Sequence, residues 1–261
     1  MKAKISNRPQ WALKCAKAGG EFHIRRQSSM RHNAINILAT VALWGCVLAL
    51  LLVSPQISPF IAVPFLGVLV GCCFFGHFIL IIHECSHNMY LLGKNTAETK
   101  KLNQKVGTIA AVPFFTAYIK HWENGHLTHH LRPCETDDPQ NPDPLDGTRL
   151  LKTLACIWFI PFGFQSFNPS NQYQGRVSRT LLGACFWVPL GALLYQLSWV
   201  PLAILYVAFC TTTSLNLLKI AQEHGSGLAK ETDPLLRSRT YFYPLQNFFS
   251  PFCINYHFEH H

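Results

Sequence analysis

The sequence predicts an all-α integral membrane protein with about four transmembrane helices in two hairpins and a cytosolic helical cap. Three observations predict this class. Hydrophobic residues make up 49% of the 261 residues and charged residues only 13%, against about 25% charged in soluble domains. Four long runs contain no charged residue, and every lysine and arginine lies outside them. Much of the surface is therefore expected to face lipid.

The four runs are long enough to cross a bilayer, since about 20 apolar residues span about 30 Å of hydrocarbon. They contain 20, 26, 17 and 20 residues and cover 34–53, 57–82, 180–196 and 199–218. The runs come in pairs, of which the first is split by SPQ and the second at LSW, whose Trp199 begins the fourth run. Such connections allow only tight turns, so we expect two hairpins.

The charge distribution predicts the orientation of these hairpins. Eight of the 22 lysines and arginines precede the first run, ten lie between the second and third, and four follow the fourth. Two hairpins place all three segments on one side, and the positive-inside rule makes this side the cytosol. The N-terminus and all thirteen acidic residues lie there too. The net charge of +9 is then explained by topology and anionic headgroups, which argues against a nucleic-acid partner.

Two shorter apolar stretches predict the cap. The stretches 106–119 and 150–167 are interrupted by Pro113 and Pro161, and proline ends or kinks a helix. We expect both to form short helices at the cytosolic interface. Together with the four spans they form a single domain over residues 1–261.

Nine of the thirteen histidines fall into four groups on the predicted cytosolic side. Residues i, i+3 and i+4 share one face of a helix, so each multi-histidine group could present its imidazoles toward one point. The second run, about 39 Å long as a helix, would carry the first group just beyond the headgroups. The groups are His83 and His87; His126, His129 and His130; His224; and His257, His260 and His261.

The other histidines are predicted to be structural or solvated. His77 is rotated by about 240° from His83 on an ideal helix, and His121 by about 140° from His126. We interpret both as structural, with His77 making a hydrogen bond inside the membrane. His32, in the basic N-terminal segment, is expected to be solvated.

This density of imidazoles indicates metal binding. Nine ligands are too many for one ion and match two, although imidazole suits Zn, Cu, Fe and Ni alike. A ligating histidine usually donates its other N–H to a carboxylate or carbonyl. The candidate carboxylates near the groups are Glu84, Glu123, Glu223, Glu259, Asp137 and Asp138.

The ordered set of motifs resembles the membrane fatty-acid desaturases and the related hydroxylases and carotenoid ketolases. The matching motifs are H-x-x-x-H at His83 to His87, H-x-x-H-H at His126 to His130, E-H-G at Glu223 to Gly225 and N-Y-H-x-x-H-H at Asn255 to His261. The order and spacing of spans and motifs agree from the first span to the last residue. Members of the family continue beyond the last motif, so we interpret the chain as truncated after His261.

The resemblance implies a centre of two non-haem iron ions bound by the nine histidines. It implies O₂ as co-substrate and electrons from a separate carrier such as a ferredoxin or a cytochrome b5-like protein. An unactivated methylene has no acidic proton, so activated oxygen is the chemistry that can cleave its C–H bond. The protein would then hold the acyl chain so that one carbon pair faces the irons.

Several alternatives remain open at the level of sequence. The leading expectation is an oxidoreductase that introduces a double bond into a fatty-acyl or lipid-linked chain. A hydroxylase or ketolase acting on a lipid or carotenoid would use the same metal centre. A membrane zinc hydrolase and an inactive fragment are alternatives of another class.

Overall fold

A computed structural model describes residues 28–135, 138, 147–159, 176–225, 227–233 and 236–238. Within this part of the chain every regular element is helical and there are no strands. Among the described residues, four helices are long and apolar enough to cross a membrane, as the sequence predicts: Ser29–Gln56, Pro59–Ser86, Thr180–Leu197 and Val200–His224.

The first pair of long helices consists of α2 (Ser29–Val53) and α3 (Pro59–His77), which are joined by the 3₁₀ turn η3 (Ser54–Gln56). The helix α2 begins five residues earlier than the predicted run because Ser28 caps it, its side chain accepting from Arg31 N at 3.5 Å. Beyond α3 the helix continues as the π-helix η4 (Phe78–His83) and the short α4 (Glu84–Ser86). This extension carries His83 and ends directly before His87, as expected.

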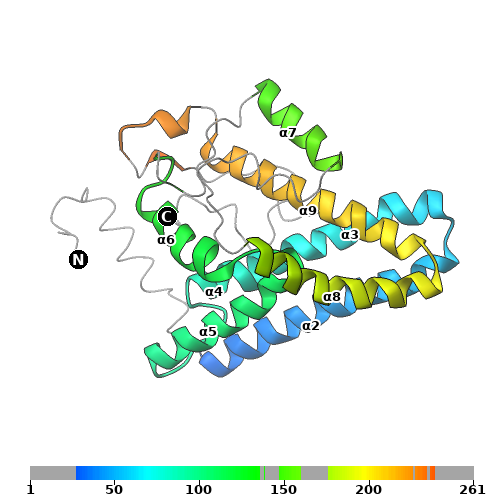
Figure 1. The fold of residues 1–261 in the computed structure, drawn as a ribbon. Coiled ribbons are helices and arrows are strands. Elements are labelled where there is room, and N and C mark those ends of the chain that lie inside the picture. Colours follow the sequence, from blue (N-terminus) through cyan, green and yellow to red (C-terminus); the bar gives the residue numbers. More distant parts are fainter. Residues whose placement is uncertain are drawn as a thin grey trace.

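The second pair consists of α8 (Arg176–Leu197) and α9 (Val200–His224), which are separated by Ser198 and Trp199. The helix α9 extends six residues past the predicted run, because its intrahelical ladder continues as far as His224. Both short connections lie at one end of the bundle, at the right of Figure 1, and α4, α6 and the end of α9 lie at the other. All histidine-bearing ends that the structure describes thus meet at one end of the bundle.

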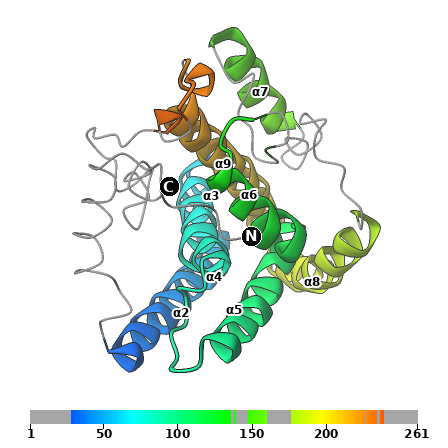
Figure 2. The same cartoon turned by 90° about the vertical axis from the view of Figure 1, so that its left-hand side faces the viewer.

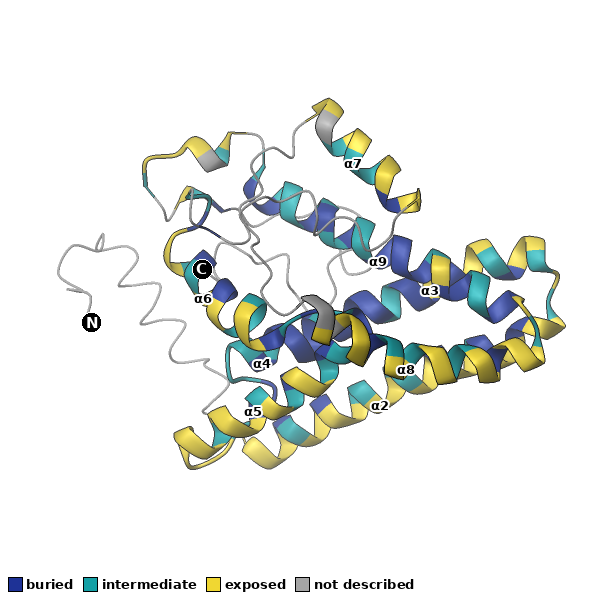
Figure 3. Cartoon of the chain, viewed as in Figure 1, coloured by how far each residue is buried: buried dark blue, intermediate teal, exposed yellow. Residues whose placement is uncertain are grey.

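Burial distinguishes an inner from an outer pair of long helices. The helices α3 and α9 are mostly buried, whereas α2 and α8 expose apolar side chains along their length (Figure 3). These exposed apolar faces suit lipid contact. The outward-facing residues include Leu38, Val41, Leu52, Leu181, Val188 and Leu193.

Small residues allow α3 and α9 to pack closely. A Cβ added to Gly67 would lie 2.5 Å from Val207 Cγ1, and one added to Gly71 would lie 2.6 Å from Thr211 Cβ. Thr212 Oγ1 also donates across the interface to the carbonyl of Gly71 at 3.0 Å. Two glycines four residues apart are a common device for close helix contact in membranes.

The predicted interfacial stretch 106–119 is not one helix. It is divided among α5 (Thr96–Ala111), the 3₁₀ turn η5 (Val112–Phe114) and the π-helix η6 (Tyr118–His126). The break follows Pro113, and Phe115 adopts a left-handed conformation with φ 54°. After η6 the chain continues into α6 (Leu127–Leu131). Figure 2 shows α5 and α6 as separate helices beside the long bundle.

The second predicted interfacial stretch, 150–167, is helical over α7 (Gly147–Phe159), and its remainder lies outside the described residues. The carbonyls at the end of α7 accept from side chains of α9: Trp158 O from the Tyr206 hydroxyl and Ile157 O from Cys210 Sγ. In the described part of the chain, the 3₁₀ turn η8 (Leu228–Lys230) follows α9.

His77 makes the structural hydrogen bonds that the sequence predicts. Its Nδ1 accepts from Trp44 Nε1 at 3.1 Å, and its Nε2 donates to the carbonyl of Ala110 at 2.9 Å. One buried imidazole therefore joins α2, α3 and α5.

Candidate metal centre

Six of the nine predicted ligands lie in the described residues and come together at the bundle end. They are His83 and His87 from the extension of α3, His126 from η6, His129 and His130 from α6, and His224 from the end of α9. The residues His83, His126, His129 and His224 are exposed by only 2%, 4%, 3% and 1%, so these four are almost completely shielded from water. His87 and His130 are half-buried. His257, His260 and His261 lie outside the described residues.

Four of the imidazoles form a first histidine group. His126 Nε2 lies 3.1 Å from His87 Nε2 and 3.0 Å from His130 Nε2. The ring of His83 lies 4.7 Å from that of His87 and 4.9 Å from that of His126. Potential ligand atoms of His83, His87 and His126 all lie within 4.8 Å of one another. This first group contains His83, His87, His126 and His130.

The second histidine group joins two distant parts of the chain. His129 Nε2 lies 3.1 Å from His224 Nε2, and the two rings are 4.7 Å apart. The sequence suggested that the three imidazoles of the motif at 126–130 point toward one place. In the structure they do not. His126 and His130 face the first group, whereas His129 faces His224. On an α-helix residue i+3 lies about 60° to one side of residue i and residue i+4 about 40° to the other, so the three side chains diverge even though they share one face.

The outer ring nitrogens are held by acceptors. Asp138 Oδ2 accepts from His129 Nδ1 at 2.8 Å, the carbonyl of Arg237 accepts from His224 Nδ1 at 2.8 Å, and Glu84 Oε1 accepts from His83 Nδ1 at 3.1 Å. These contacts place the proton on Nδ1 and the lone pair on Nε2. They orient the lone pairs into the two groups.

The geometry fits bound cations. In the second group, two lone-pair nitrogens face each other at 3.1 Å, an arrangement that is repulsive unless a cation lies between them. Two imidazole nitrogens that are each about 2.1 Å from one metal ion and in adjacent positions are about 3.0–3.4 Å apart. The Nε2–Nε2 distances of 3.0–3.1 Å in both groups are within this range.

Electrostatics favours the neutral, metal-binding form of the imidazoles. Burial lowers the pKa of His87. Burial and the neighbouring histidines lower the pKa of His126 well below its usual value and that of His130 to about 2. At neutral pH these rings are therefore unprotonated, and an unprotonated nitrogen is what a metal ion requires.

The remaining predicted carboxylates have other partners. Glu123 accepts from Gln104 Nε2 at 2.8 Å and lies 3.5 Å from Lys100 Nζ. Glu223 accepts from Lys219 Nζ at 2.6 Å, and both residues of this pair are buried. Asp137 and Glu259 lie outside the described residues.

The sequence reasoning missed a set of polar residues that hold the chain after His87. His32 Nε2 donates to Met89 O at 2.7 Å, and Asn36 Nδ2 donates to Tyr90 O at 2.8 Å. Asn103 donates to Leu91 O at 2.8 Å and accepts from Leu91 N at 3.0 Å. His32 is thus buried and bonded rather than solvated. The available signal was its position one turn before Asn36, at the start of an apolar helix.

The rotation of about 140° between His121 and His126, expected for an ideal α-helix, does not apply in the structure. Residues Tyr118–His126 form a π-helix, whose turn is wider than 3.6 residues. The ring of His121 packs edge-on against Trp122, at a centroid distance of 5.7 Å.

Replacing Asp138 with alanine is expected to weaken metal retention by about 10- to 100-fold, because His129 loses the carboxylate that orients it. The rate of metal loss from purified protein to a chelator measures this effect. Glu123→Ala is the matched control, since Glu123 bonds to Gln104 and Lys100. Equal rates for the two variants would contradict the orienting role of Asp138.

Fold and site together define a helical membrane-type protein with a buried, histidine-lined candidate metal centre at one end of its bundle. Comparison with protein families matches residues 58–261 to the model described as fatty acid desaturase. The chain belongs to the fatty acid desaturase family, which implies an oxidoreductase of lipid chains. Searches among curated proteins and among solved structures give no match.

Proposed function

We propose that the chain is an O₂-dependent di-iron enzyme that introduces a double bond into a fatty-acyl or lipid-linked chain. The observation that carries the proposal is the pair of adjacent histidine groups whose Nε2 atoms face each other at 3.0–3.1 Å. The rings of His126 and His129 are 5.9 Å apart, so the two groups are close enough to serve one bimetallic centre.

The residues divide into ligands and orienting groups. His83, His87, His126 and His130 would hold one iron, and His129 and His224 would hold the other with His257, His260 and His261. Asp138, Glu84 and the carbonyl of Arg237 keep the lone pairs directed inward, and burial excludes water. The bound irons would supply activation of O₂. With two electrons from a carrier and two protons from solvent, removal of two hydrogens from adjacent carbons would yield the double bond and two water molecules.

Membrane position and partners follow from the same proposal. The four apolar helices would cross the bilayer as two hairpins, with lipid against α2 and α8. The one-sided distribution of lysine and arginine supports placing the N-terminus and the histidines on the cytosolic side. A ferredoxin or cytochrome b5-like donor would deliver electrons at that side.

The test is an assay of protein purified from iron-supplemented cells. We expect two irons per chain and a lipid product with two hydrogens fewer, formed only when O₂ and a reductant are present. A product with one added oxygen would instead indicate a hydroxylase or ketolase. One zinc per chain, with hydrolysis in the absence of O₂, would overturn the proposal.

A further inference from the structure

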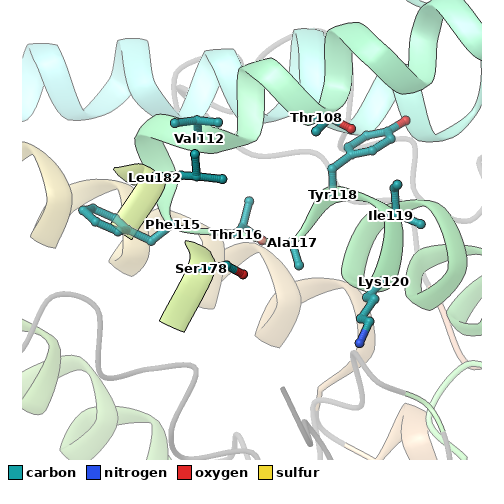
Figure 4. A pocket seen from close by; sticks show the side chains of 10 residues that line it. All are labelled: Thr108, Val112, Phe115, Thr116, Ala117, Tyr118, Ile119, Lys120, Ser178 and Leu182. Carbon is teal, nitrogen blue, oxygen red and sulfur yellow. The ribbon is translucent and has the colours of Figure 1, made fainter. Parts of the chain in front are cut away.

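A cavity of about 280 Å³ lies where η5 and η6 meet the beginning of α8. Its walls come from the end of α5, the turn after Pro113, the first residues of η6 and the first turns of α8 (Figure 4). The lining residues include Val112, Phe115, Thr116, Lys120, Ser178 and Leu182.

Contacts on two sides fix the depth of this cavity relative to the long helices. Trp187 Nε1 donates to Pro113 O at 2.6 Å. Trp187 lies seven residues after Thr180, which is about 10 Å along α8 at 1.5 Å per residue. The ring of Phe115 lies so close to Gly183 that an added Cβ would be 2.3 Å from its Cδ1. On the opposite side, the ring of Phe114 lies 5.3 Å from that of Phe74 on α3. The turn is therefore level with the inner part of the apolar helices rather than with their ends.

The lining changes from apolar to polar along this depth. Val112, Phe115 and Leu182 form an apolar wall, whereas Ser178 precedes the apolar span at Thr180, and Lys120 is exposed on η6. Thr116 is 7% exposed, and its hydroxyl has no hydrogen-bond partner within the part of the chain that the structure describes. A buried hydroxyl without a partner is unfavourable, so a ligand that accepts from it would stabilise the site.

We propose that this cavity binds one glycerophospholipid from the surrounding leaflet. The upper part of an acyl chain lies against Val112, Phe115 and Leu182, and the ester and phosphate oxygens meet Thr116, Ser178 and Lys120. A volume of about 280 Å³ is at the lower limit of ligand pockets. The cavity therefore holds only the part of the lipid where the acyl chain joins the ester and phosphate groups, and the rest of the lipid stays in the bilayer. The site does not depend on the proposed enzymatic reaction, although η6 leads from it directly to His126.

The experiment compares three proteins in nanodiscs that contain phosphatidylglycerol with a photoreactive acyl chain. In the wild type we expect crosslinks in the peptides that carry Val112 and Leu182. Leu182→Trp should fill the cavity and reduce these crosslinks at least about ten-fold. Leu193→Trp is the matched control on the same helix, because Leu182 and Leu193 are 55% and 63% exposed. It should crosslink at Val112 as the wild type does.

A second variant, Thr116→Val, tests the same site independently if Leu182→Trp misfolds. Thr116→Val keeps the side-chain shape and removes the hydroxyl, and it should reduce crosslinking about five-fold. Unfolding temperature and metal content are measured for every variant, and they should match the wild type. Equal crosslinking in wild type, Leu182→Trp and Thr116→Val would overturn the proposal. Competition by soluble oleoyl-CoA, without competition by unlabelled phosphatidylglycerol, would also overturn it.

Discussion

Replacing His126 with alanine is expected to remove one metal ion per chain and to lower activity by at least about 100-fold, since even orienting residues around metal ligands contribute 10- to 100-fold. His126 occupies the centre of the first histidine group, because its Nε2 lies within 3.1 Å of the Nε2 atoms of both His87 and His130. Elemental analysis of the purified variant measures the metal content, and product formation measures the activity.

The matched control is His121→Ala, the same exchange five residues earlier on η6. His121 packs against Trp122, so this variant should keep the metal content of the wild type. The unfolding temperature of both variants is measured in parallel, which separates loss of the site from loss of the fold. Full metal content in a folded His126→Ala protein would exclude His126 as a ligand.

Replacing Gly71 with leucine is expected to destabilise the protein by about 3 kcal/mol or more, the upper range for overpacking. A Cβ at this position would lie 2.6 Å from Thr211 Cβ and 2.9 Å from the carbonyl oxygen of Ala208. The backbone oxygen cannot move aside as a flexible side chain can, so α3 and α9 must separate. Because η4 follows α3 and carries His83, and α9 ends at His224, the metal content should fall as well.

The control for Gly71→Leu is Gly45→Leu, since a Cβ at Gly45 would meet nothing within 4 Å. Both glycines lie within candidate spans, so the two exchanges add the same apolar side chain to an apolar helix, and only Gly71 faces another helix. Unfolding temperature and elution profile in detergent measure the difference. A Gly71→Leu protein as stable as Gly45→Leu would show that α3 and α9 are not held in close contact.

Gly67 and Gly71 stand four residues apart in the sequence, but this spacing does not identify the helix that they contact. Only the structure shows that Val207 and Thr211 occupy the space which the two glycines leave. The helix that packs against such a pair of glycines depends on how the bundle is arranged, and a single sequence does not show this arrangement.

The orienting groups of the site were predicted unevenly for a similar reason. Asp138 and Glu84 contact histidines, as the sequence suggested, whereas Glu123 and Glu223 bond to Lys100, Gln104 and Lys219. Proximity in sequence places a carboxylate near an imidazole, but rotation about the helix decides which group it meets. The carbonyl of Arg237 on His224 could not be foreseen, because every residue carries a carbonyl.

Local chemistry in the sequence determined the apolar helices, the charge on their flanks and the histidines that gather at their ends. These properties follow from composition over about 20 residues and from short spacings, which act along the chain. Only the tertiary structure decided that His129 contacts His224, 95 residues away, and not the same partners as His126 and His130. It also decided that two π-helices precede the histidines and alter their rotation. Helix crossings and local helix type depend on packing between distant segments, so they become determined only when the bundle forms.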